Sequence, residues 1–241
     1  MKAVVEAENI SKSFGEKQVL QGTSLTVGEG ENVVILGRSG TGKSVFIKCI
    51  VGLVEPDEGT IKVLGKDVLN INRRDMNAIR KDIGFLFQGA ALYDSMSVRE
   101  NLAFPLRTIK MNKDEVETHV KEALDNVGLA EAIDKMPAEL SGGMRKRVGL
   151  ARAIIMKPKI ILYDEPTTGL DVITSREISE LILDIQKKYN TGSIIITHDM
   201  PCAKITANRI LVLRDGKFAA EGTYDELEKH ENPDIKSFFE F

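Results

Sequence analysis

The sequence has few of the residues that build disulfide frameworks and metal clusters. Only two cysteines, Cys49 and Cys202, and three histidines occur among 241 residues. The two cysteines are far apart and lie at no spacing typical of metal ligands, in apolar or helical contexts. We therefore expect two reduced thiols in the core of a cytosolic protein, which excludes a small secreted disulfide scaffold.

The chain also lacks long apolar runs and a strong excess of charge. No run approaches the roughly 20 apolar residues needed to cross a bilayer, and Glu6 and Glu8 interrupt the first apolar residues, so no signal peptide is predicted. The formal net charge is −3, so the chain lacks the strong excess of basic residues that is typical of nucleic-acid-binding proteins. One basic cluster at residues 145–147 is expected on a solvated helix face. Any role at a membrane must then depend on a partner.

The most specific pattern in the chain is a glycine-rich segment that follows the apolar residues 33–36 and precedes a predicted helix. It matches G-x-x-x-x-G-K-[ST], the phosphate-binding P-loop or Walker A motif. Glycines allow a tight turn whose N–H groups point at phosphate oxygens, and the following helix adds its positive end. The residues of this loop are Gly37, Arg38, Ser39, Gly40, Thr41, Gly42, Lys43 and Ser44. Lys43 is expected to reach the β- and γ-phosphates and Ser44 to bind Mg²⁺.

A second informative pattern is the apolar run 160–163, which ends in two acids, Asp164 and Glu165. An apolar strand ending in acids is the Walker B pattern, in which Asp164 holds the Mg²⁺ bound by Ser44. Adjacent strand residues point in opposite directions, so Glu165 is free to face an attacking water as a general base. Without the P-loop, two solvated acids would be the better interpretation.

A third pattern is Leu140-Ser141-Gly142-Gly143, which reads as the start of a second helix that suits an anion. Two phosphate-binding helix starts thus lie far apart in one chain. Two chains arranged head-to-tail, each loop facing Ser141 of the other, bring them together more simply than one chain folded over itself. An ordinary helix cap is the alternative.

The remaining pattern predicts an α/β protein with two further parts. An antiparallel β layer is expected at residues 4–10, 19–27 and 59–65, with turns at residues 14–15 and 28–30. A parallel sheet is expected to contain the apolar strands 160–163 and 193–196, each of which is followed by polar residues. Between those two strands, Thr174 and Glu177 are expected to form the capping box of a helix. Residues 94–157 are expected to form an inserted helical subdomain, with helices starting at Asn112 and after Ser141.

These motifs, in their order and spacing, resemble those of ATP-binding cassette (ABC) ATPases over nearly the whole chain. The resemblance identifies Gln88 as the Q-loop glutamine, Asp171 as part of the D-loop (169–171), His198 as the switch histidine and Phe14 as the adenine-stacking aromatic, which is usually tyrosine. It implies one nucleotide-binding domain spanning 1–241, with a RecA-like P-loop NTPase core at 1–93 and 158–241 and a helical signature subdomain at 94–157. It further implies bound ATP and Mg²⁺, a head-to-tail homodimer, Gln88 acting on Mg²⁺ and the attacking water, and His198 contacting the γ-phosphate.

The signature departs from the commonest one because Met144 replaces glutamine. The longer run LSGGMRKRVGLARAI, together with NLAFPLR at residues 101–107, resembles the ATPases of the Mla/MCE lipid-transport systems. That resemblance implies an integral-membrane permease partner, an MCE-type lipid-binding protein, phospholipid transport and a location on the cytoplasmic face of the inner membrane. An amino-acid importer ATPase remains an alternative. A non-transport ABC protein is a further alternative, although the chain has neither the long coiled coil of DNA-repair members nor the paired cassettes of translation factors.

Two apolar segments have no assigned role in these motifs. Residues 90–93, which include Leu92 and Tyr93, form either a groove for a permease helix or part of the helical core. The C-terminal Ile235, Phe238, Phe239 and Phe241 are expected to pack on the chain's own core rather than on a neighbour.

Overall fold

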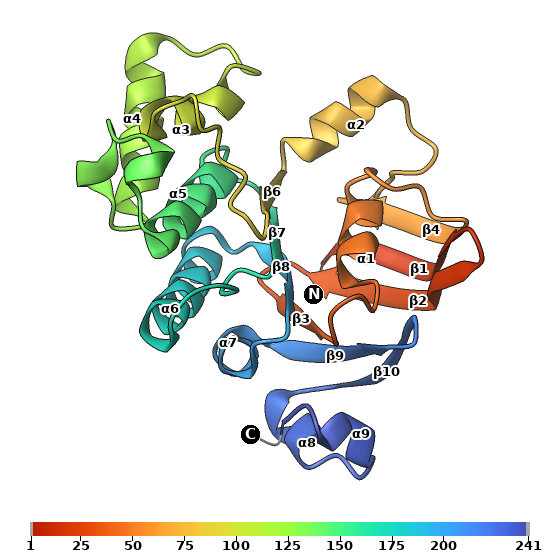
Figure 1. Ribbon diagram of the computed structural model, residues 1–241. Coiled ribbons are helices and arrows are strands. Elements are labelled where there is room, and N and C mark those ends of the chain that lie inside the picture. The colour runs from red at the N-terminus through yellow and green to blue at the C-terminus, as the bar shows by residue number, and fades with distance from the viewer. Residues whose placement is uncertain (1, 240–241) are drawn as a thin grey trace.

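A computed structural model describes residues 2–239 and contains two sheets within an α/β architecture (Figure 1). The larger sheet has the order β10-β9-β3-β8-β7-β6, and all its neighbours are parallel except β10 and β9. Its strands are β3 (Asn32–Leu36), β6 (Ile83–Leu86), β7 (Ile160–Asp164), β8 (Gly192–Thr197), β9 (Arg209–Arg214) and β10 (Lys217–Gly222). The predicted parallel core is therefore confirmed.

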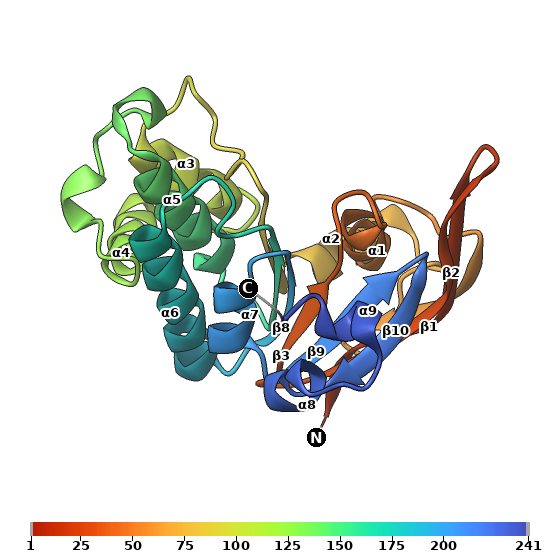
Figure 2. The ribbon, with the colours of Figure 1, turned by 60° about the horizontal axis from the view of Figure 1, so that its bottom comes forward.

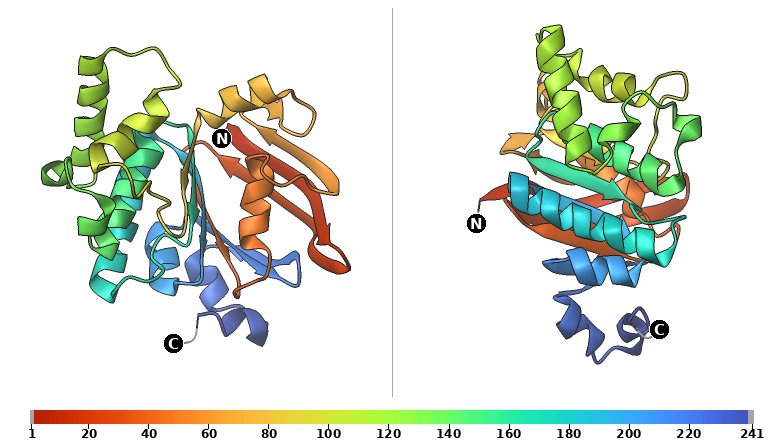
Figure 3. Two further views of the ribbon diagram at one scale, coloured as in Figure 1. Left: turned by 45° about the horizontal axis from the view of Figure 1, so that its top comes forward. Right: turned by 90° about the vertical axis from the view of Figure 1, so that its left-hand side faces the viewer.

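The central strands β3, β7 and β8 are buried along their whole length, as their continuous apolar runs predict. Successive side chains point to opposite faces, so each strand supplies two separate cores. Val34 and Tyr163 pack with the helical part of the chain, whereas Ile35 and Leu162 pack with α1 (Lys43–Ile50) and the smaller sheet. The parallel sheet thus lies between the two other parts of the molecule, as Figure 3 shows.

The smaller sheet has the order β2-β1-β4-β5 and is antiparallel, as expected. Its strands are β1 (Ala3–Phe14), β2 (Lys17–Gly28), β4 (Glu58–Val63) and β5 (Lys66–Asp67). The first two strands are longer than predicted, because residues 11–14 and 17–18, polar except for Phe14, continue their pairing as a hairpin that projects from the body in Figure 2. β4 ends at Val63, since Leu64 and Gly65 both have positive φ and form a turn.

Two helices after the Walker B strand cover the parallel sheet. They are α6 (Val172–Tyr189), between β7 and β8, and α7 (Met200–Thr206), between β8 and β9. The predicted capping box of α6 is wrong: Asp171 is the N-cap and accepts hydrogen bonds from the Thr174 N–H and hydroxyl, while Glu177 instead pairs with Arg147 at 2.8 Å. Asp171 is the better cap because it lies three residues before Thr174 in extended backbone.

All the regular secondary structure between β6 and β7 is helical. It contains α3 (Val98–Leu106), α4 (Lys113–Asp125), the 3₁₀ turns η1 (Ala130–Ala132) and η2 (Pro137–Glu139), and α5 (Gly142–Ile154). The predicted starts at Asn112, with its Glu115 capping box, and at Ser141 are confirmed. The division of the chain at residues 94 and 157 stays a prediction. A separate helix, α2 (Arg73–Arg80), lies before β6.

The C-terminal end adds two short helices, α8 (Tyr224–Glu228) and α9 (Pro233–Lys236). Ile235 and Phe239 are buried in the same core as α5 and α6, so packing on the chain's own core is confirmed for them. Phe241 lies outside the described residues. Both cysteines are buried and free, as predicted, and no helix within residues 2–239 has the length and apolarity to span a bilayer.

Candidate functional site

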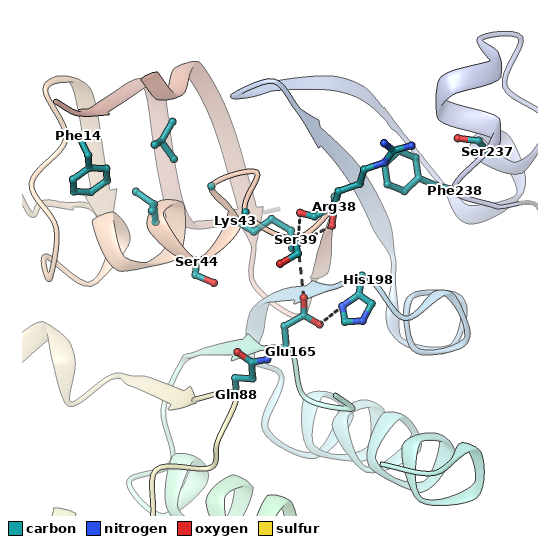
Figure 4. A pocket seen from close by; sticks show the side chains of 15 residues that line it. Phe14, Arg38, Ser39, Lys43, Ser44, Gln88, Glu165, His198, Ser237 and Phe238 are labelled. Carbon is teal, nitrogen blue, oxygen red and sulfur yellow. Dashed lines mark hydrogen bonds and ion pairs between the residues drawn. The ribbon is translucent and has the colours of Figure 1, made fainter. Parts of the chain in front are cut away.

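The loop after β3, the ends of β6, β7 and β8, and the C-terminal segment meet around a cleft of about 630 Å³ (Figure 4). Parallel strands place their carboxyl ends at one edge of the sheet, which is where α/β proteins bind ligands. The site residues predicted from the sequence that line this cleft are Phe14, Gly37, Arg38, Ser39, Gly40, Gly42, Lys43, Ser44, Gln88, Glu165 and His198.

Three glycines of the P-loop have conformations or surroundings that require glycine. Gly40 and Gly42 have φ of 78° and 104°, in the left-handed region. A Cβ on Gly37 would lie 2.7 Å from the carbonyl oxygen of Leu213, and one on Gly42 would lie 2.9 Å from that of Val19. Thr41 does not line the cleft; its hydroxyl donates to the Arg38 carbonyl at 2.9 Å and so shapes the loop from within.

Lys43 crosses back over this loop from the first turn of α1. Its Nζ donates to the carbonyls of Gly37 at 2.7 Å and Arg38 at 3.1 Å, and lies 3.8 Å from Oε1 of Glu165. Burial lowers the pKa of Lys43, opposed by the two nearby acids Glu165 and Asp164. A positive charge is thus fixed at the turn whose backbone suits a phosphate.

Ser44 and Asp164 lie side by side at the end of β7. The Ser44 hydroxyl donates to Oδ1 of Asp164 at 3.0 Å. A hydroxyl and a carboxylate are hard oxygen ligands of the kind Mg²⁺ takes when substrate phosphates and waters complete its shell, so this pair fits the ion. Burial raises the pKa of Asp164, while the Ser44 hydrogen bond opposes that shift. Among residues 2–239, no group of three or more acidic, histidine or cysteine side chains forms a metal cluster.

Glu165 has partners of its own, different from the Ser44 hydroxyl that binds Asp164. His198 Nδ1 lies 2.8 Å from Oε2, and the Thr168 hydroxyl donates to the same oxygen at 3.1 Å. Both carboxylate oxygens therefore have neighbours, with Lys43 on one side and His198 on the other (Figure 4).

The signature residues Ser141, Gly142 and Gly143, and Asp171, do not line this cleft. The Ser141 hydroxyl accepts from the Met144 N–H at 3.2 Å and caps α5, and Asp171 caps α6. The two helix starts are close to each other, because a Cβ on Gly143 would lie 2.6 Å from Cγ2 of Thr174. They therefore form a second, exposed surface of small and polar groups.

The sequence profile of the ABC transporter family matches residues 20–168. The chain belongs to the ABC transporter family. It is 38% identical to a methionine import ATP-binding protein, MetN, of Clostridium tetani, over 98% of this chain and 74% of that protein. It is equally 38% identical to a probable ribonucleotide transport ATP-binding protein, mkl, of Mycobacterium leprae, over 99% of this chain and 69% of that protein. Identity alone therefore does not distinguish the transported substrate.

Solved structures agree with this assignment. The ATP-binding cassette MJ0796, solved as a dimer in a post-hydrolysis state bound to ADP and Pi, superposes with a TM-score of 0.83 at 32% identity, over 91% of this chain and 98% of that one. cbiO1 of Clostridium perfringens, part of the ABC transporter complex cbiONQ, superposes with a TM-score of 0.85 at 29% identity, over 92% of this chain and 89% of that one. The expected α/β P-loop fold and ABC membership are confirmed, and this ABC chain is an ATPase that binds ATP.

Several contacts of this ABC ATPase were not predicted. Lys146, expected on a solvated face, is only 5% exposed, and its Nζ donates to the carbonyls of Gln88 and Glu165. The sequence does carry a signal for this burial. The apolar residues Met144, Val148, Ala151 and Ile155 share one face of α5, and the opposite face holds Lys146 with Gly149, Leu150 and Ala153, so the helix is apolar on two sides. Ser237 and Phe238 also line the cleft, through tertiary packing that no local pattern predicts.

Proposed function

We propose that the chain energises a membrane transporter by hydrolysing ATP in the cleft between the P-loop, Asp164 and Glu165. The observation that carries this proposal is the geometry of two acids with separate partners, Asp164 with Ser44 and Glu165 with Lys43 and His198. In this proposal Asp164 would hold Mg²⁺ and Glu165 would act on water, and phosphoryl transfer requires both of these roles.

The roles of the individual residues follow from their positions. The P-loop N–H groups and Lys43 would bind and orient the phosphates, Phe14 (52% exposed) would offer a ring face to the adenine, and Ser44, Asp164 and Gln88 are the proposed Mg²⁺ ligands. Mg²⁺ supplies neutralisation of charge on the transferred phosphate. Glu165 takes a proton from the attacking water, and His198, exposed beside it, contacts the γ-phosphate.

The second surface is explained by a head-to-tail homodimer. Ser141 to Gly143 and Asp171 lie outside the cleft of their own chain, and the neighbouring Val172 and Ile173 are 83% and 75% exposed. Adjacent apolar side chains exposed to that extent commonly mark an interface. In a head-to-tail pair, the N-terminus of α5 would face the phosphates bound by the partner, and each ATP would lie between two chains. The dimeric MJ0796 cassette supports this arrangement.

A second cleft, here called the aromatic groove, has the properties of a docking site for a permease helix. It measures about 900 Å³ and is lined by Phe85, Phe87, Tyr93 and Phe104 with the stem of Arg152, among others. Tyr93 and Phe104 are 45% and 36% exposed, and their rings lie 4.9 Å apart. The lining also includes the basic residues Arg80 and Lys81, and a groove that combines aromatic rings with polar groups suits an amphipathic helix. Leu92, which we also expected here, is not a lining residue but packs partly buried against the helical core.

The proposed cargo is a phospholipid, with an MCE-type lipid-binding protein as a further partner and the ATPase on the cytoplasmic face of the inner membrane. Support comes from the runs LSGGMRKRVGLARAI and NLAFPLR, which resemble those of the Mla/MCE lipid-transport ATPases. The equally similar MetN supports amino-acid import as the second candidate.

Purification of the chain with its partners from gently solubilised membranes tests these proposals. We expect a membrane-spanning permease, an MCE-type protein and bound phospholipid, with ATP turnover in the complex. A periplasmic amino-acid receptor without lipid would reject the lipid assignment and leave the ATPase assignment intact. Co-purification with ribosomes or DNA and no permease would reject the transport role.

A further inference from the structure

Helix α5 carries two buried or half-buried cations that bind main-chain carbonyls instead of acids. Lys146 Nζ donates to the carbonyl oxygens of Gln88 at 2.5 Å and Glu165 at 2.9 Å. Two turns further on, the Arg152 guanidinium donates to the carbonyls of Ala90 and Ala91, both at 2.9 Å. One helix thus holds the segment after β6 at both ends, and through Lys146 it also holds the backbone of Glu165.

Three of the four carbonyls that these cations bind belong to residues with an unfavourable backbone conformation, Gln88 being the exception. Glu165, Ala90 and Ala91 have φ of 51°, 58° and 51°, in the left-handed region that side chains rarely adopt. Such strain persists only where the surroundings hold it, and it is concentrated at functional sites. The N–H of Glu165 donates to the Ile196 carbonyl at 2.9 Å, and its carbonyl accepts from the Thr168 N–H at 3.4 Å. Lys146 adds the shorter hydrogen bond to that carbonyl, at 2.9 Å.

Helix α5 packs closely against the segment at residues 86–91. A Cβ on Gly149 would lie 2.9 Å from Leu86 Cδ1 and 3.0 Å from Ala90 Cβ. Glycine at 149 therefore lets the helix approach closely enough for Lys146 to reach Gln88. The same segment continues to Ala91 and Tyr93 in the aromatic groove.

Lys146 is also costly to bury, which argues against an incidental contact. Burial lowers its pKa, and the nearby Glu165 and Asp164 carboxylates oppose that shift. A buried ammonium needs its protons satisfied, and here the carbonyls of Gln88 and Glu165 accept from it.

We propose that Lys146 is a positioning residue that sets the orientation of Glu165 according to the position of the segment at residues 88–91. A displacement of that segment at the aromatic groove moves the Gln88 carbonyl, and the shared lysine transmits the movement to the Glu165 backbone. The proposal rests on the proposed role of Glu165 as the base. It gives the chain a direct connection, inside one subunit, between the permease-docking surface and the group that activates water.

Removal of the lysine donors in the assembled transporter complex tests this directly. In Lys146→Met, the apolar stem remains and both hydrogen bonds are lost. We expect kcat for ATP to fall by about 10- to 100-fold, the effect of misplacing a reacting group by roughly 1 Å, while the Kd for ATP changes less than about twofold. Lys187→Met, which removes the same charge from an exposed position in the last turn of α6, away from the cleft and the start of α5, should keep wild-type kcat.

A double-mutant comparison distinguishes an effect of Lys146 that acts through Glu165 from a loss of activity by another route. If Lys146 acts through Glu165, adding Lys146→Met to Glu165→Gln should leave the residual turnover unchanged within about twofold. An equal loss of ATP affinity in Lys146→Met, wild-type kcat in that variant, or a further large loss on top of Glu165→Gln would each overturn the proposal.

Two further variants of Lys146 complete the test. Lys146→Arg, which retains donors on a long stem, should recover part of the lost kcat, and a Lys146→Arg variant that turns over no faster than Lys146→Met would overturn the assignment of the effect to the two hydrogen bonds. Should Lys146→Met fail to fold, Lys146→Gln with one amide donor takes its place with the same expected split between kcat and Kd. Wild-type turnover in Glu165→Gln would instead refute the proposed base, whereas a normal Lys146→Met beside an inactive Glu165→Gln would refute the positioning role alone.

Discussion

His198 and Glu165 form a direct pair, with Nδ1 of the histidine 2.8 Å from Oε2 of the carboxylate. Lys43 Nζ lies 3.8 Å from the other oxygen, Oε1, and the Thr168 hydroxyl shares Oε2. Glu165 is 9% exposed, whereas the His198 side chain is 61% exposed. The carboxylate is thus held in a defined orientation by a buried lysine and an accessible histidine, and its Oε1 lies towards Lys43 of the P-loop.

Replacing Glu165 by glutamine tests whether this carboxylate is the general base. The amide is the same size and can still accept from Thr168, so ATP binding should persist while hydrolysis falls by roughly 10²–10⁴-fold, the contribution of a positioned base. ATP-bound dimer should then accumulate, which size measurement with ATP and Mg²⁺ detects. A monomer with normal turnover contradicts the assignment.

Asp164 links the chemistry of the site to the stability of the fold. Burial raises its pKa, so the folded chain keeps this proton to a higher pH than the unfolded chain does. Above the ordinary pKa of 3.8, the ionised carboxylate therefore costs stability, and the cost reaches its full value once the pH exceeds the raised pKa.

Asp164→Asn should remove this cost and the metal ligand together. With EDTA present, we expect its Tm at pH 7 to exceed that of the wild type by roughly 2–4 °C, and the difference should narrow as the pH falls towards 4, where the wild-type carboxyl also becomes neutral. ATP turnover should be lost. A lower Tm for the variant at pH 7 would show that the ionised carboxylate is not a net cost.

Gly84 tests the close contact between β6 and α5. A Cβ at this position would lie 2.4 Å from the Ala153 carbonyl oxygen, a backbone atom that cannot rotate away. Gly84→Ala should destabilise the chain by about 1–3 kcal/mol, the usual cost of overpacking. Gly89→Ala, where nothing lies within 4 Å, is the matched control and should unfold at the wild-type denaturant midpoint. Equal midpoints for the two variants would contradict the contact.

The parts of the structure that follow from local pattern were predicted well. Continuous apolar residues specified β7 and β8, Asn112 and Ser141 specified helix starts, and the P-loop spacing specified the turn before α1. In each case the physical cause lies within a few residues of the feature, such as a cap three residues from its N–H or a strand buried on both faces.

The features that were missed arise from contacts between distant segments. The basic residues 145–147 look solvated on their own, yet α5 packs against β6 and the turn after β7, which buries Lys146 and leaves Arg145 exposed. Thr174 and Glu177 match a capping box, but Asp171 competes for the same N–H and Arg147, from another helix, recruits Glu177. Phe238 reaches the cleft only because Phe239 packs into the core beside Tyr224.

Mixed dimers test whether Ser141 acts on the ATP of the partner chain. In a head-to-tail dimer of Lys43→Ala with Ser141→Arg chains, both defects fall in one composite site and the other site is whole. Each variant alone should be inactive, and the mixture should regain ATPase activity where one intact site suffices. A Ser141→Arg dimer that hydrolyses ATP at the wild-type rate would refute a role for this residue in either chain.

Tyr93 tests whether the aromatic groove receives the permease. Its ring is 45% exposed, lies 4.9 Å from that of Phe104 and is 6.0 Å from the Arg152 guanidinium. A carboxylate there would leave a charge facing an apolar helix, which costs several kcal/mol when buried at an interface. Tyr93→Asp should therefore release the ATPase from membranes while the isolated chain keeps its ATP affinity, since Tyr93 does not line the nucleotide cleft.

Leu53→Asp, which places the same charge on a 57% exposed residue outside the groove, should stay membrane-bound. Retention of Tyr93→Asp in a coupled complex would show that the permease docks elsewhere, and release of both variants would show that added charge alone weakens the complex.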